Sequence, residues 1–244
     1  MELKRQLGLF TGIMVIIADM IGTGIFMTTG NILGMTNNAL IVILLWVLGG
    51  VVALCGALSY SELAVLWPDV GGEYIYLKKI FGNLPAFLTG WVSLIVGFTA
   101  PVATSSMLLV QYLNKFFINI HATGITTITD DIFWQKNIAA LIIITFGCIH
   151  IMGVKRGSAI QNILTVIKIA IVAAFIIAGF YVLDSSAIHR LYAHYGTVEA
   201  GSIPLIGLSL LMVMFAYTGW NGATYIAGEI VAPEKNLPRI MFWG

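Results

Sequence analysis

The chain has 244 residues, of which 59% are hydrophobic and 9% are charged, and its formal net charge is +1. Soluble domains carry about 25% charged residues, so this composition excludes an ordinary water-soluble domain. The near-zero net charge gives no reason to expect nucleic acid or another polyanion as a partner. Composition therefore predicts an integral membrane protein whose main surroundings are the lipid bilayer.

Six apolar runs are long enough to cross a bilayer as helices, because a hydrocarbon core about 30 Å thick needs roughly 20 helical residues. They predict an all-α, polytopic transmembrane helix bundle that forms a single membrane domain over residues 1–244. A polar loop with two prolines follows the sixth run, and we expect a seventh helix that is cut off near its start. The six runs are residues 8–30, 39–66, 84–114, 137–154, 158–183 and 202–230.

Lysine and arginine in the short loops predict the orientation of the helices, since positive loops stay on the cytoplasmic side. A cytoplasmic N-terminus places eight of these residues inside and three outside. The first run is too long for the core of a signal peptide, so we interpret it as a retained helix. The inside set is Lys4, Arg5, Lys78, Lys79, Lys155, Arg156, Lys235 and Arg239, and the outside set is Lys115, Lys136 and Arg190.

The first run is interrupted by glycine at Ile21-Gly22-Thr23-Gly24. Each glycine weakens a helix by roughly 1 kcal/mol relative to alanine. A backbone that opens inside a membrane is tolerated only where it faces protein or a cavity, so its freed polar groups can hold a ligand. The alternative is that these small residues serve close helix packing.

Two charged residues fall inside apolar runs, Asp19 in the first and Lys168 in the fifth. A charge at mid-membrane costs at least roughly 2.5–3.5 kcal/mol on insertion scales, so each is a functional candidate that needs a partner. Lys168 lies too deep in its run to reach the interface, which favours a position facing the bundle interior. The two residues are candidate partners, and a purely structural ion pair is the alternative.

The sixth run contains a second interruption, between Phe215 and Gly222. Paired interruptions in two apolar segments indicate a transporter site, where the N-terminus of a half-helix faces an anion and freed carbonyls face a cation. A zwitterionic amino acid offers both charges. The aromatic side chains here can cover a substrate or simply pack in the core. The candidate residues of this segment are Phe215, Ala216, Tyr217, Thr218, Gly219 and Trp220.

Other kinds of chemistry lack a signal in the sequence. Cys55 and Cys148 both lie in apolar runs, where a thiol behaves as a small hydrophobe. The sequence has no phosphate-binding loop, paired-histidine metal motif or nucleophile elbow. We therefore expect no enzyme, no catalytic residue, no cofactor and no metal site.

Several segments together resemble the amino acid-polyamine-organocation (APC) superfamily of permeases, in particular its L-type amino-acid transporter branch. They occur in the order found in that family and span nearly the whole chain. The segments are Ile21-Gly-Thr-Gly-Ile-Phe, Tyr60-Ser-Glu-Leu, Pro68-Asp-Val-Gly-Gly-Glu-Tyr-Ile-Tyr-Leu, Phe215-Ala-Tyr-Thr-Gly-Trp-Asn and Gly228-Glu-Ile-Val-Ala-Pro-Glu-Lys-Asn-Leu-Pro-Arg.

The resemblance implies a fold of two inverted five-helix repeats, of which this chain would hold the first repeat and the first helix of the second. It implies that the substrate carboxylate meets the N–H groups of Gly22, Thr23 and Gly24. The amino group would meet carbonyls near Phe215 to Tyr217. It also implies that Lys168 takes the place that sodium holds in sodium-coupled relatives, which favours coupling to a proton or to exchange.

Two features depart from the family pattern. Asp19 is acidic where relatives more often carry a small or uncharged polar residue, so it can serve coupling or grip the amine of a cationic substrate. The loop at residues 115–136 has no cysteine, so no disulfide-linked heavy chain is expected.

We therefore expect secondary transport of an amino acid by alternating access in the cell membrane. The missing C-terminal half and a second copy of the chain are candidate partners. The rival interpretation is a truncated, non-transporting membrane protein that depends on a partner.

Overall fold

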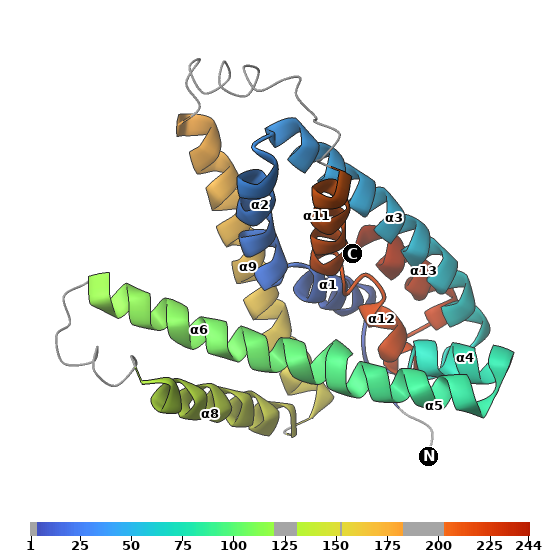
Figure 1. The fold of residues 1–244 in the computed structure, drawn as a ribbon. Helices are drawn as coiled ribbons and strands as arrows, with labels where there is room; N and C mark the ends of the chain where they lie inside the picture. Colours follow the sequence, from blue (N-terminus) through green and yellow to red (C-terminus); the bar gives the residue numbers. More distant parts are fainter. Residues whose placement is uncertain (1–3, 120–130, 152, 183–202) are drawn as a thin grey trace. The chain divides into compact units, whose positions relative to one another are not determined.

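The computed structural model describes residues 4–119, 131–151, 153–182 and 203–244 (Figure 1). Its described residues form helices joined by turns. The first half contains α1 (Leu9–Met20), α2 (Thr23–Thr36), α3 (Ala39–Leu66), α4 (Glu73–Phe81), α5 (Asn83–Val92), a π-helical turn (Ser93–Thr99) and α6 (Ala100–Asn119). The second half contains α8 (Ile132–Ile151), α9 (Val154–Val182), α11 (Ile203–Ala216), α12 (Gly222–Tyr225), a 3₁₀ turn (Ala227–Glu229) and α13 (Pro233–Trp243).

Five helical stretches are long and apolar enough to cross a membrane, as judged by length and composition. They overlap the first five apolar runs of the sequence, although the first extends to Thr36 and the fourth begins at Ile132. The sixth run contains the shorter apolar helix Pro204–Ala216 and then the interrupted segment. The five stretches are Leu9–Thr36, Ala39–Leu66, Asn83–Lys115, Ile132–Ile151 and Val154–Tyr181.

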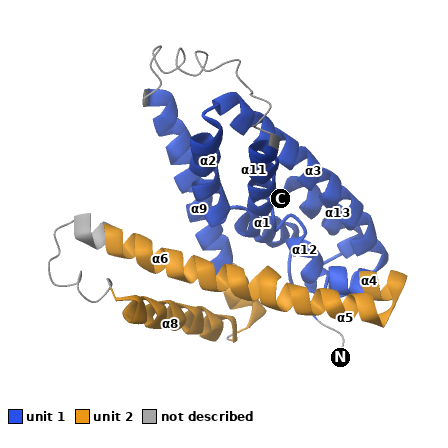
Figure 2. Cartoon of the chain, in the orientation of Figure 1, with its two compact units in different colours: residues 1–76, 160–244 blue, residues 77–159 orange. Residues whose placement is uncertain are grey.

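The chain divides into two compact units (Figure 2). The larger comprises residues 1–76 and 160–244, and the smaller comprises residues 77–159. The larger unit contains both glycine-containing interruptions and Lys168. The candidate site therefore lies within one unit. The single membrane domain stays a prediction, and the outer loop that contains Arg190 lies outside the described residues.

The larger unit has two apolar clusters. In the first, Ile16 of α1 and Ala57 of α3 pack with Leu237 and Ile240 of α13. In the second, Ile32 of α2 packs with Val42 and Leu45 of α3 and Val213 of α11. The helix α3 therefore contacts α13, α11 and α2.

The smaller unit pairs α6 with α8. The span Asn83–Lys115 continues through the π-helical turn Ser93–Thr99, which the sequence did not predict. Pro101 lies two residues after this turn, and proline cannot donate a hydrogen bond to the carbonyl of residue 97. The wider turn accommodates this missing bond, and the Thr99 hydroxyl donates to the Leu94 carbonyl at 2.5 Å.

The N-terminal segment is fastened to the loop that follows α12. The backbone N–H groups of Gln6 and Leu7 donate to the Glu229 carbonyl at 2.8 and 2.9 Å, and Val231 N–H donates to the Leu7 carbonyl at 2.9 Å. The pairing is a short parallel β-bridge between Leu7 and Ile230. It ties the start of α1 to the segment that follows the second interruption.

Candidate functional site

The first interruption separates α1 from α2. The helix α1 ends at Met20, Ile21 and Gly22 lie outside a helix, and α2 begins at Thr23. The backbone of Gly22 is extended, with φ −113° and ψ −160°. The predicted break at Gly22 is therefore confirmed. The expectation that it reaches Gly24 was wrong, because Thr23 and Gly24 already form the first turn of α2.

The second interruption separates α11 from α12. Phe215 and Ala216 are the last residues of α11, so the expectation that the break begins at Phe215 was wrong by two positions. Residues 217–221 form a turn before α12 begins at Gly222. Gly219 has φ +110°, a left-handed conformation that side-chain-bearing residues rarely adopt. The conformation of this turn therefore favours glycine at position 219.

The two interruptions lie against each other. A Cβ atom added to Gly24 would lie 2.9 Å from both Cα and Cβ of Ala216, so α2 crosses α11 at contact distance beside the breaks. A Cβ atom added to Gly219 would lie 2.8 Å from the carbonyl carbon of Asp19. Gly24 thus serves the close helix packing that we considered as an alternative. The same packing also brings the two breaks together.

The breaks leave backbone polar groups without helical partners. The first N–H groups of α2, from Thr23 to Ile25, have no acceptor one turn earlier, and they carry the partial positive charge of the helix N-terminus. In the described part of the chain, the carbonyl oxygens of Asp19 and Ala216 accept no backbone hydrogen bond across the breaks. These donors and acceptors therefore belong to the segments of α1, α2 and α11 that meet at the two breaks.

Lys168 binds the end of α1. Its ammonium Nζ donates to the Ala18 carbonyl at 3.0 Å, so a positive charge lies at the C-terminal end of a helix, where the helix dipole favours it. Asp19, the candidate partner of Lys168, lies close enough for the two charges to interact, and their partnership in coupling stays a prediction. The Asp19 carboxylate lies against Gly222, the first residue of α12.

Tyr217 and Trp220 pack against glycines of α3. The Tyr217 hydroxyl donates to the Trp46 carbonyl at 3.0 Å, and the two rings lie 5.4 Å apart. A Cβ atom at Gly56 would lie 3.0 Å from the Trp220 ring, which itself lies 4.9 Å from the Tyr60 ring. Both aromatics therefore pack against α3, and their role in covering a substrate stays a prediction.

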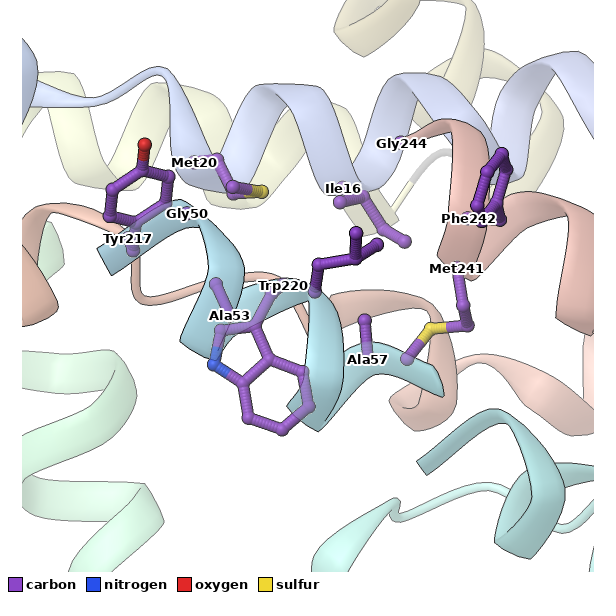
Figure 3. Close-up of a pocket in the computed structure, with 11 residues that line it drawn as sticks. Ile16, Met20, Gly50, Ala53, Ala57, Tyr217, Trp220, Met241, Phe242 and Gly244 are labelled. Carbon is purple, nitrogen blue, oxygen red and sulfur yellow. The ribbon is translucent and has the colours of Figure 1, made fainter. Parts of the chain in front are cut away.

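A cavity of about 140 Å³ opens beside these rings (Figure 3). Engineered apolar cavities of roughly 150 Å³ hold benzene, so this one can take a small apolar group. Phe215 does not line it and is 63% exposed. Thr218 does not line the cavity either, and its hydroxyl donates to the Phe215 carbonyl. The lining residues include Ile16, Met20, Ala53, Tyr217, Trp220 and Met241.

One polar contact in this unit was missed by sequence reasoning. The Asn221 side-chain amide donates to the Glu73 carboxylate at 2.6 Å, although the two residues are 148 positions apart in the sequence. The available signal was an acidic residue that follows two glycines, Gly71 and Gly72, in the loop between two apolar runs. Among the described residues, no group of three or more His, Cys, Asp or Glu side chains is placed to hold a metal ion.

Comparison with known proteins identifies the family. The family model described as amino acid permease matches residues 7–244. The chain belongs to the amino acid permease family. With five helices suited to crossing a bilayer, this permease is a multi-pass membrane protein.

Three relatives illustrate the similarity. The b(0,+)-type amino acid transporter 1 of Homo sapiens is 32% identical over 244 residues, which covers 100% of this chain and 48% of that protein. The serine/threonine exchanger SteT of Bacillus subtilis (strain 168) is 29% identical over 243 residues, covering 99% of this chain and 51% of that protein. The Asc-type amino acid transporter 1 of Mus musculus is 32% identical over 248 residues, covering 98% and 44%. This permease chain thus spans about half the length of the curated relatives it matches.

Proposed function

We propose that this chain belongs to a secondary transporter that moves an amino acid across the cell membrane by alternating access. The observation that carries the proposal is the contact between the two interruptions, Gly24 against Ala216 and Gly219 against Asp19. Interrupted helices that meet inside a membrane protein are the usual construction of a transporter binding site. The transporter and exchanger names of the relatives support the same reading.

The chemistry of the breaks suits a zwitterion. The N–H groups of Thr23, Gly24 and Ile25 would bind the substrate carboxylate, because a helix N-terminus offers several donors and a positive partial charge. The carbonyls of Asp19 and Ala216 would accept from the substrate ammonium group. Tyr217 and Trp220 would fix the shape of the second break through their packing on α3.

The orientation and coupling follow from charge. A cytoplasmic N-terminus would leave most loop lysines and arginines inside. The Lys168 ammonium already supplies a fixed positive charge at the end of α1, so we propose coupling to a proton or to exchange rather than to sodium. In this scheme Asp19 is either the partner of Lys168 in coupling or an anchor for a cationic substrate.

Hydrogen exchange of the backbone amides tests the binding site directly. With the chain in nanodiscs, saturating mixtures of zwitterionic L-amino acids should slow exchange at residues 21–26 and 215–221. Gly24→Leu should abolish this protection, because a side chain at Gly24 collides with Ala216. Gly30→Leu is the matched control on α2, since a Cβ atom there meets nothing within 4 Å.

A separate measurement of folding distinguishes loss of binding from loss of structure. Tryptophan fluorescence during thermal unfolding reports whether each variant is folded before exchange is measured. Protection in the wild-type chain at segments other than the two breaks would place the ligand elsewhere. Protection that survives in folded Gly24→Leu would contradict the assignment of the first turn of α2.

A further inference from the structure

The loop between α3 and α4, residues 67–72, packs closely against α12. Gly72 has φ +48°, and a Cβ atom there would lie 2.7 Å from the Thr224 hydroxyl oxygen. The backbone N–H of Gly71 donates to the Tyr225 carbonyl at 3.3 Å. Glycine has no side chain and adopts positive φ without strain, so it allows these two segments to approach this closely.

Glu73, the first residue of α4, follows this loop and bonds to the same segment. The Asn221 side-chain amide donates to the Glu73 carboxylate at 2.6 Å. The side chain of Tyr225 also hydrogen-bonds to this carboxylate. Asn221 directly precedes α12, and Tyr225 is its last residue. The half-buried Glu73 side chain therefore holds α12 at both ends.

The ionised form of Glu73 suits these two partners. An amide N–H and a tyrosine hydroxyl are donors, whereas a neutral carboxylic acid would replace one acceptor site with an O–H donor. Donors also bond more strongly to a carboxylate than to a neutral acceptor. Burial raises the pKa of the Glu73 carboxyl group, and the bonds from Asn221 and Tyr225 oppose that rise. The attachment therefore depends on a carboxylate at one position that faces an amide at the other.

Continuity with α11 does not fix the position of α12, because a turn separates the two helices. The helix α11 ends at Ala216, and residues 217–221 form the turn, in which Gly219 is left-handed. The Thr224 hydroxyl donates to the Asn221 carbonyl at 2.7 Å, so α12 keeps its own shape beyond the turn. Its position therefore depends on tertiary contacts, such as those with α1 and with Glu73.

We propose that Glu73 is a positioning residue that fixes α12 against the α3–α4 loop through a carboxylate–amide bond to Asn221. It thereby holds in place the second interruption, whose residues 217–221 lead directly into α12. The importance of this position for substrate binding rests on the proposed function. The attachment itself is testable without any substrate.

Reversing the amide and the carboxylate tests the attachment. Asn221→Asp places a second carboxylate beside Glu73. Combining it with Glu73→Gln restores an amide and a carboxylate that face each other in the opposite direction. Both substitutions preserve the size and shape of the side chain. The matched control combines Glu62→Gln with Asn221→Asp, because Glu62 is an exposed glutamate on α3 and the net charge of the two double variants is equal.

The measurement is amide hydrogen exchange of residues 222–226 at neutral pH in the nanodisc-bound chain, after tryptophan fluorescence has shown that each variant is folded. Loss of a hydrogen bond to a charged group should raise local opening in Asn221→Asp roughly tenfold or more. The reversed pair should exchange at close to the wild-type rate, and the control should stay as open as Asn221→Asp. Wild-type exchange in Asn221→Asp, or a reversed pair no better protected than the control, would overturn the proposal.

Protection by substrate separates this inference from the proposed function. Zwitterionic amino acids should protect residues 215–221 less in Asn221→Asp than in wild type, and the reversed pair should regain that protection. Equal protection in all variants would contradict a positioning role for Glu73. If amino acids protect no variant but the exchange of residues 222–226 follows the expected pattern, the proposed function fails while the Glu73 attachment stands.

Discussion

The chemistry of the candidate site is concentrated in a few side chains and many backbone groups. Lys168 is bound to the Ala18 carbonyl rather than to a side chain, so its charge acts on the end of a helix. Asp19, the next residue, lies between that helix end and Gly222 of α12. We therefore expect a change of charge at either residue to alter the electrostatic environment of the interruptions.

This arrangement predicts the pH dependence of uptake by the gene product that contains this sequence. If Lys168 and Asp19 couple proton binding to alternating access, Lys168→Ala and Asp19→Asn should each flatten the dependence, by the reciprocity of linked equilibria. The measurement is radiolabelled amino-acid uptake into proteoliposomes across a pH series. A change only in which substrates bind to Asp19→Asn would instead favour its role as a substrate anchor and contradict coupling through Asp19.

Secondary-structure elements of the larger unit are joined at one end by the N-terminal segment. Gln6 and Leu7 bond to Glu229, and Val231 bonds back to Leu7, so α1 and the segment after α12 share a backbone pairing. The helices α1 and α12 also contact each other directly. We expect α1 and α12 to move together whenever either half-helix moves.

Removing one backbone donor tests this connection. Gln6→Pro eliminates the N–H that donates to the Glu229 carbonyl, while the exposed Gln6 side chain contributes little. Loss of about 1 kcal/mol should raise local opening of residues 229–231 about fivefold in hydrogen exchange. Arg5→Pro is the control, because Arg5 is exposed and lies outside the pairing. Equal exchange in both variants would show that the pairing does not hold these segments together.

At the scale of the whole molecule, the apolar surface dominates. Only 6–22% of the residues in the most apolar window of each membrane-spanning stretch are buried within the chain. Lipid or further protein is needed to cover the rest, since such a surface is unstable in water. The relatives are about twice as long as this chain. In those proteins, the additional residues are available to cover part of such a surface.

We therefore predict that the 244-residue chain inserts into membranes but does not catalyse uptake alone, because the resemblance assigns half of the transport machinery to a second repeat. Carbonate extraction of membranes tests insertion, and proteoliposome uptake of a labelled amino acid tests transport. Saturable uptake by the purified chain would contradict the prediction. Crosslinking would then show whether two copies assemble into one transport unit.

The sequence by itself determined the class of protein, the apolar spans and the positions of both interruptions to within two residues. These features follow from composition, from the length needed to cross a bilayer and from glycine's effect on helices, all of which are local. Gly22 and Gly219 are cases in which the local signal was sufficient. The family motifs are continuous segments of the sequence, so they could be recognised without a structure. The match of the family model over residues 7–244 confirmed the family.

Only the tertiary structure decided which groups meet. The sequence offered Asp19 as a candidate partner of Lys168, but it did not reveal that the Lys168 ammonium also donates to the Ala18 carbonyl, an acceptor that the end of a helix provides. Tyr217 and Trp220 were placed on α3 by glycines at 49, 50 and 56, which have no local link to the break. Glu73 and Asn221, 148 positions apart, were joined only by folding, since a contact between distant segments depends on how helices pack.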